Sequence, residues 1–194
     1  MAKKNFVMEL MTLETERLVL RLIRENDAPA LHRIMNDPEV THNLLFPYPL
    51  PKEQLAIWIK SSIEGFSSRE KYPMVIVLRE SNEVIGVCAF YRVNWEHMNA
   101  ELVYWLGKQH WGKGYMTEAV RRMLVFGFEE LGFERIYAGC FTRNLASRRV
   151  LEKVGFLYEG LARHEFKKGD EFLDVFHFGL TRSEFFKEKY KTRV

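Results

Sequence analysis

The run Trp111-Gly112-Lys113-Gly114-Tyr115-Met116-Thr117-Glu118-Ala119 combines the features of a phosphate site between a strand and a helix. The apolar residues 102–106 before it predict a strand. Two closely spaced glycines allow the backbone to turn so that successive N–H groups converge on one point. The helix predicted after them would direct its positive dipole end at the same point. The run therefore predicts a pyrophosphate site.

Two common nucleotide-binding loops do not match this run. The dinucleotide fingerprint has a third small residue three positions after its second glycine, where this chain has Thr117. A P-loop has Gly-Lys followed by Ser or Thr, whereas here Gly114 follows Lys113. An ordinary strand-to-helix turn would also use these glycines. A phosphate-bearing ligand on a third kind of scaffold is the better interpretation.

The composition is that of one globular domain, residues 1–194, with 47% hydrophobic and 28% charged residues. The net charge of +3 is spread along the chain, so no nucleic-acid-binding stripe is expected. No apolar run approaches the length of about 20 residues that spans a membrane. Cys88 and Cys140 lie in apolar runs, which predicts core thiols and a cytoplasmic protein.

Hydrophobic periodicity predicts an α/β domain whose mixed sheet carries helices on both faces. The predicted strands cover residues 16–24, 72–79, 84–93, 100–106, 135–141, 156–164 and 172–180. The predicted helices begin after Asn26 or Asp27, at 52–66, after Gly114 and at 144–154, and residues 37–51 are expected to form a proline-rich loop. The sheet would therefore have about seven strands.

Three motifs in matching order resemble the GNAT N-acetyltransferases, and together they span nearly the whole chain. The glycine run resembles the acyl-CoA loop of that family, and residues 144–156, from Asn144 to Phe156, resemble its following helix. Thr15-Glu16-Arg17-Leu18-Val19-Leu20-Arg21 resembles the opening strand of the branch that acetylates the N-termini of ribosomal proteins. The resemblance implies an α+β fold with a mostly antiparallel sheet, and acetyl-CoA as cosubstrate.

The family's loop pattern can be placed in two registers. Gln109-His110-Trp111-Gly112-Lys113-Gly114 satisfies the letters, whereas the register that starts at Trp111 places the helix immediately after its fixed glycine, Gly114. The second register is preferred here. In it, Trp111 replaces the Arg or Gln of the family pattern, and Met116 replaces its small residue. By resemblance, the cofactor contacts are assigned to the strand end, the glycine run and the next helix: Leu106, Trp111, Gly112, Lys113, Gly114, Tyr115, Met116 and Asn144. Asn144 is equally suited to be a plain helix N-cap.

Acyl transfer to an amine needs a neutral amine, donors for the oxyanion, and a hydrogen bond or proton for the leaving thiolate. Many family members supply the last from a tyrosine, but that position is Leu151 here. The resemblance to the ribosomal-protein branch assigns that part to Ser147 and the general base to Glu165, with Glu101 as the rival base. The oxyanion donor is expected among the backbone N–H groups of residues 104–106.

The chain has no nucleophile elbow and no metal-ligand spacing among its six histidines, so direct attack in a ternary complex without a metal is expected. The acceptor is a primary amine: a protein N-terminus such as that of a ribosomal protein, or a small molecule such as an antibiotic or polyamine. A non-catalytic acyl-CoA sensor is the alternative that Leu151 keeps open. The sequence leaves the oligomeric state open, with a homodimer possible.

Overall fold

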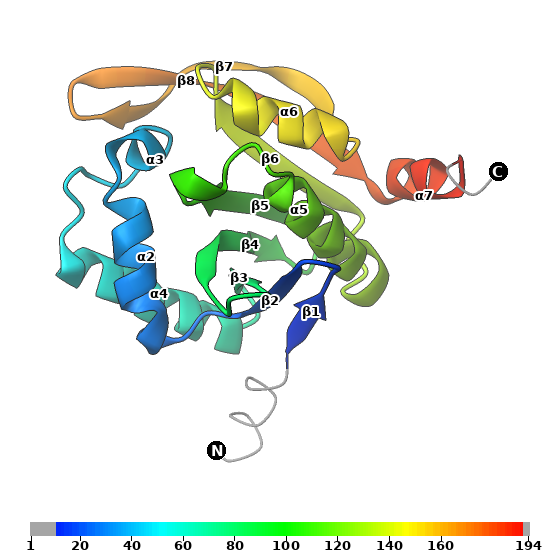
Figure 1. Ribbon diagram of the computed structural model, residues 1–194. Coiled ribbons are helices and arrows are strands. Elements are labelled where there is room, and N and C mark those ends of the chain that lie inside the picture. The colour runs from blue at the N-terminus through cyan, green and yellow to red at the C-terminus, as the bar shows by residue number, and fades with distance from the viewer. Residues whose placement is uncertain (1–10, 192–194) are drawn as a thin grey trace.

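The computed structural model describes residues 11–191, with side chains through Lys187, so the ends of the predicted domain lie outside the described residues. These residues form one mixed sheet of eight strands in the order β1-β2-β3-β4-β5-β6-β8-β7 (Figure 1). The strands are β1 (Thr12–Glu14), β2 (Leu18–Leu22), β3 (Tyr72–Leu78), β4 (Val84–Asn94), β5 (Asn99–Leu106), β6 (Arg135–Phe141), β7 (Leu157–Lys168) and β8 (Glu171–Thr181). The expected count of about seven omitted β1, whose three residues are too short to show a period.

Helices cover both faces of the sheet, as expected. The first group is α2 (Ala28–Met35), α3 (Pro38–His42) and α4 (Lys52–Ser67), and the second is α5 (Tyr115–Val125) and α6 (Leu145–Lys153) (Figure 1). Helix α7 (Arg182–Lys191) follows β8, and short helical turns occupy Glu25–Asp27, Lys108–His110 and Phe126–Glu130. None of the helices between residues 11 and 191 is both long and apolar enough to cross a membrane.

The prediction of a loop over residues 37–51 was wrong at its start, where α3 forms. Asp37 caps this helix, since its carboxylate accepts from the N–H of Glu39 at 2.8 Å and of Val40 at 3.4 Å. Pro38 occupies the first helical position, where its missing N–H costs nothing. A single turn is too short for a periodic signal, so only its cap could have revealed it.

Strand β5 separates two hydrophobic cores because its side chains alternate between the faces of the sheet. Leu102 and Leu106 belong to the core under α5, and Trp105 belongs to the core under α2 and α4. Trp105 packs there against Phe46 and Trp58, with ring centroids 6.5 and 5.3 Å away. The end of β5 therefore contacts both halves of the molecule.

Strands β5 and β6 are the one parallel pair among the described strands, and they separate after three residues. Asn99–Glu101 pair with Arg135–Tyr137, and no later residue of β5 pairs with β6 in the described sheet. On its other edge β5 stays paired with β4 as far as Leu106. Residues 102–106 consequently have no strand partner on the edge that faces a split in the sheet.

Candidate active site

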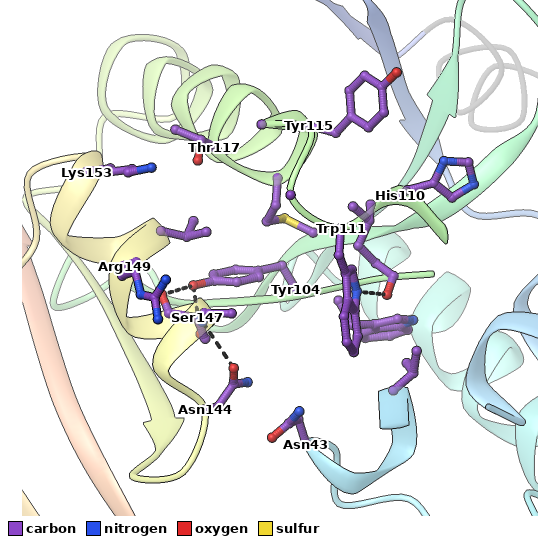
Figure 2. A pocket seen from close by; sticks show the side chains of 18 of the residues that line it. Asn43, Tyr104, His110, Trp111, Tyr115, Thr117, Asn144, Ser147, Arg149 and Lys153 are labelled. Carbon is purple, nitrogen blue, oxygen red and sulfur yellow. Dashed lines mark hydrogen bonds between the residues drawn. The ribbon is translucent and has the colours of Figure 1, made fainter. Parts of the chain in front are cut away.

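A cavity of about 360 Å³ lies at this split (Figure 2). Its walls come from α3 and the residues after it, the end of β5, the glycine turn with the start of α5, and helix α6. The lining residues are Val40, Asn43, Leu44, Tyr104, Trp105, Leu106, His110, Trp111, Gly112, Gly114, Tyr115, Met116, Thr117, Asn144, Ala146, Ser147, Arg149, Val150 and Lys153. The cavity is thus bordered by residues from both hydrophobic cores.

The glycine turn has the backbone geometry that the sequence predicts. Gly112 and Gly114 have φ of +73° and +80°, a region in which residues with a side chain are strained, and α5 begins directly after Gly114. Met116 is buried in the core under α5 and also lines the cavity. The start of α5 directly after Gly114 is what the register beginning at Trp111 requires, while two left-handed glycines also suit the register beginning at Gln109.

The N-terminal motif holds the glycine turn in place. Glu118, in the first turn of α5, accepts from the Thr15 hydroxyl at 2.6 Å and from the Arg17 backbone and guanidinium at 3.0 and 2.7 Å. Burial opposes ionisation of Glu118, but these hydrogen bonds prevail and lower its pKa. Arg17 also donates to the Lys113 carbonyl at 3.0 Å and lies over the Tyr115 ring. Residues 15–17 and 113–118 therefore form one unit.

Trp111 and Lys113 take different positions in this turn. The Trp111 indole lines the cavity and donates to the Leu106 carbonyl at 2.8 Å, so that carbonyl already has a partner (Figure 2). Lys113 lies outside the lining residues, and its carbonyl accepts from Arg17. A cofactor contact from Lys113 therefore remains a prediction that the cavity does not support.

Helix α6 presents Asn144 and Ser147 to the cavity. The Asn144 side chain caps the helix by accepting from the Ser147 N–H at 3.1 Å, and the Ser147 hydroxyl lies 2.9 Å from the Tyr104 hydroxyl of β5 (Figure 2). Leu151, the position where the family often has tyrosine, is fully buried in the core. Sequence reasoning considered only the backbone of Tyr104; its place on the same strand face as Leu102 and Leu106 was the available signal.

Two cations at the α6 side of the cavity were also missed. Arg149 and Lys153 both line it, one turn of helix apart, and Thr117 from α5 lies opposite (Figure 2). A pair of basic residues near a glycine turn at a helix N-terminus suits a ligand with several phosphates. Their spacing of four residues on a predicted helix was the signal, but it resembles any solvated face.

The two candidate bases lie together but outside the cavity lining. Glu165 of β7 pairs with His177 of β8, with Oε2 and Nε2 2.6 Å apart, and Glu101 of β5 lies 3.4 Å from the Arg92 guanidinium. Burial raises the pKa of Glu101, and the Glu165 charge adds to that shift, while Arg92 and His177 oppose it. The rivals are thus neighbours in one carboxylate–histidine cluster on β5, β7 and β8.

The β7–β8 hairpin fixes the opposite wall of the cavity. Lys168 at its tip donates to the carbonyls of Thr41 and Leu44, at 2.5 and 2.7 Å, and Arg143 donates to the His42 carbonyl at 2.7 Å. These cations meet the C-terminal end of α3, where carbonyls lack helical partners. Because Asn43 and Leu44 line the cavity, the hairpin positions the wall farthest in sequence from the glycine turn.

The side chains of the described chain include no group of three or more His, Cys, Asp or Glu residues placed to hold a metal ion. The cysteines Cys88 and Cys140 are both buried free thiols.

Comparisons with known proteins agree with this geometry. Residues 17–157 match the family described as the acetyltransferase (GNAT) domain. The chain is 35% identical to an uncharacterized N-acetyltransferase, p20, of Bacillus licheniformis, over 90% of this chain and 98% of that one. It is 24% identical to the ribosomal-protein-serine acetyltransferase of Escherichia coli (strain K12), over 83% and 90% of the two chains. A spermidine N-acetyltransferase from Vibrio cholerae, solved in complex with CoA and spermine, shares the fold with a TM-score of 0.78, 20% identity and coverage of 89% and 99%.

Fold, glycine turn and family match define the class: the chain belongs to the GNAT acetyltransferases. It is accordingly an acetyl-CoA-dependent N-acetyltransferase. Proteins that share one fold differ in the amine that they acetylate and in the residues that carry the reaction.

Proposed function

We propose that the protein acetylates the α-amino group of a protein N-terminus, by direct attack on acetyl-CoA in a ternary complex. The observation that carries this proposal is a cavity at the β5–β6 split whose lining comes from α3 on one side and from α5 and α6 on the other. Acetyl-CoA would enter from the side of α5 and α6, and the amine from the side of α3. Both substrates would then meet at the free edge of β5, where proximity supplies much of the rate.

The donor half of the site suits each part of acetyl-CoA in turn. The left-handed glycines and the N-terminus of α5 would bind the pyrophosphate, and Arg149 and Lys153 would add charge. The Gly107 N–H points to β4, where it donates to Ile85 at 2.8 Å. Since backbone groups alternate along a strand, the N–H groups of Tyr104 and Leu106 face the split. They are the proposed donors to the pantetheine and the oxyanion.

Proton handling follows from the placement of Ser147 and the carboxylate cluster. Ser147, at the cavity, would hydrogen-bond the leaving thiolate. Glu165 or Glu101 would accept the amine proton through water, because neither lines the cavity. The raised pKa of Glu101 brings that carboxyl nearer to the range in which a general base works.

The most specific part of the proposal is the identity of the amine acceptor. None of the cavity-lining residues is Asp or Glu, so the cavity offers no carboxylate partner to a second ammonium group. That supports an α-amine over a polyamine, as does the similarity to a ribosomal-protein-serine acetyltransferase. A small polyamine is the second candidate, favoured by the nearby cluster of Glu101 and Glu165. The two buried thiols support a reducing, cytoplasmic setting.

An amine panel tests the proposal. Calorimetry first measures CoA binding, and release of free thiol from acetyl-CoA is then followed with peptides bearing free N-termini, with the same peptides N-acetylated, and with spermidine. Turnover with the free peptides alone supports the proposal. Faster turnover with spermidine would make the protein a polyamine acetyltransferase, and CoA binding without turnover on any amine would make it a sensor.

Single substitutions distinguish the two candidate bases, Glu165 and Glu101. Glu165→Gln is expected to lower kcat roughly ten- to a thousandfold, a range scaled to general base catalysis, and Glu101→Gln less. The reverse order would assign the base to Glu101. Wild-type rates in both variants would contradict a carboxylate base.

A further inference from the structure

Strand β5 supplies a phenolic hydroxyl to the cavity, whereas helix α6 has Leu151 at the position where many family members have a tyrosine. The Tyr104 ring extends from β5 to α6, and its hydroxyl lies 2.9 Å from Ser147 Oγ and 3.1 Å from the Ser147 carbonyl (Figure 2). Both residues line the cavity at the free edge of β5. In sequence they are 43 residues apart, so the contact exists only in the folded chain.

Tyr104 can act only as an un-ionised hydroxyl. Burial raises its pKa well above the usual range, and the Ser147 hydrogen bond only partly opposes that shift. A neutral phenol has one proton to donate, either to Ser147 Oγ or to the Ser147 carbonyl. In the first arrangement the Ser147 proton is free to point into the cavity; in the second it points back to Tyr104.

The other group beside Ser147 does not compete for its proton. Burial raises the pKa of the Cys140 thiol to about 11, with the Ser147 hydrogen bond opposing the shift, so this thiol stays neutral near pH 7. A neutral thiol is a weak acceptor. Within residues 11–191, no backbone carbonyl accepts from Ser147 Oγ at hydrogen-bond geometry. The serine proton is therefore available to a ligand whenever Tyr104 donates to Ser147 Oγ.

We propose that Tyr104 is a positioning residue for acyl transfer: its hydroxyl donates to Ser147 Oγ and directs the Ser147 proton at the sulfur of CoA. This inference rests on the proposed function, which places that sulfur beside Ser147. A thiolate would select the productive arrangement, because hydrogen bonds to an ionised acceptor are roughly twice as strong as neutral ones.

The step balances without ionising either hydroxyl. The C–S bond of the tetrahedral intermediate breaks, its electron pair remains on sulfur, and the amine proton leaves to the carboxylate cluster. CoA departs as a thiolate that holds the Ser147 hydrogen bond. Tyr104 and Ser147 keep their protons and need no external reactant.

The experiment titrates the thiol of bound CoA, which requires no knowledge of the amine. The protein is saturated with CoA, and thiolate absorbance is followed with pH. A thiolate that accepts a hydrogen bond titrates lower, so the bound thiol is expected roughly one unit or more below free CoA. Tyr104→Phe keeps the ring but removes the hydroxyl, and should return most of that shift. With an accepted amine it should lower kcat about tenfold, with KM for acetyl-CoA unchanged.

A double variant and a matched control complete the test. Because Tyr104 acts through Ser147, Ser147→Ala combined with Tyr104→Phe should be no worse than Ser147→Ala alone. Tyr91→Phe is the control: the Tyr91 hydroxyl of β4 lies 3.0 Å from the Ser62 hydroxyl, away from the cavity lining, and burial raises the pKa of Tyr91 to about 12. It should leave the CoA titration and kcat unchanged.

The outcomes separate this inference from the proposed function. A wild-type titration in Tyr104→Phe, or additive losses in the double variant, would overturn the positioning role while leaving the acetyltransferase reaction intact. Bound CoA with an unshifted thiol in the wild type would overturn it as well. Absence of CoA binding by calorimetry would instead overturn the proposed function, and the inference with it.

Discussion

The molecule contains two tyrosine–serine pairs with nearly equal hydrogen bonds and different surroundings. Tyr104 and Ser147 meet at 2.9 Å beside the cavity, and Tyr91 and Ser62 meet at 3.0 Å between β4 and α4. Burial raises the pKa of both phenols, so both act as neutral hydroxyls. Geometry and protonation therefore do not distinguish the pairs.

The fate of the serine proton distinguishes them. Ser62 donates to the Trp58 carbonyl of its own helix at 2.8 Å, which leaves Tyr91 to donate to Ser62 and satisfies both protons. Ser147 has no such carbonyl partner among the described residues, and its side chain borders the cavity. A closed pair of this kind stabilises packing, whereas an open pair can accommodate a ligand.

The largest expected difference between the two pairs is in catalysis. Ser147→Ala should lower kcat roughly ten- to a thousandfold, the scale of general acid–base effects, because the leaving thiolate loses its hydrogen bond. Ser62→Ala should leave kcat unchanged. Free-thiol release under saturating acetyl-CoA measures both, and equal losses in the two variants would remove the distinction.

For stability the order of the two serine variants should be reversed, and the effects should be smaller than those on kcat. Ser62 is fully buried, so Ser62→Ala leaves the Tyr91 hydroxyl without its acceptor and should lower the free energy of unfolding by about 1–3 kcal/mol. Ser147 is only half-buried and its partner faces a cavity that water can enter, so Ser147→Ala should cost less. Denaturant unfolding at neutral pH decides; a larger loss in Ser147→Ala would show that this pair too is structural.

The smallest expected effect is on stability, from the contact of Glu118 with Thr15 and Arg17 beside the cavity. Glu118→Gln should lower the free energy of unfolding by about 1 kcal/mol at pH 7, since Thr15 and Arg17 lose a charged acceptor. The pKa of Glu118 is depressed in the folded protein, so this stability is fully present above the ordinary pKa of a glutamate in the unfolded chain. It is lost as the pH falls through the lower pKa of the folded state. The difference in free energy of unfolding between wild type and variant should therefore disappear at acidic pH.

Thermal unfolding across that pH range measures this difference in stability. The same variant also tests whether Glu118 holds the glycine turn. CoA affinity should weaken in Glu118→Gln without a change in kcat, because Glu118 holds the turn and touches no reacting atom. The matched control is Glu64→Gln, at an exposed position of α4, which should leave the dependence of stability on pH as in the wild type. A difference in stability that widens in acid would contradict the assigned pKa shift.

Local signals were enough for most of the fold and for part of the candidate site. Residues 135–141 were predicted as the strand that β6 forms, and residues 52–66 as the helix α4, because their periods extend over a full element. Asn144 and Ser147 could be found because a cap and a helix serine stand at fixed positions in one motif. Strand β1 and helix α3 were missed because three- and five-residue elements are too short to show a period.

The sequence by itself supplied the glycine turn with residues that can adopt it, since left-handed backbone at positions 112 and 114 is unstrained only without a side chain. Tertiary structure alone decided which partners meet at the split. It brought Tyr104 to Ser147, set Glu101 near Glu165 through His177, and joined Lys168 to the carbonyls after α3. These contacts depend on strand order and on where β5 leaves β6, which many distant residues decide together through packing, so no local pattern encodes them.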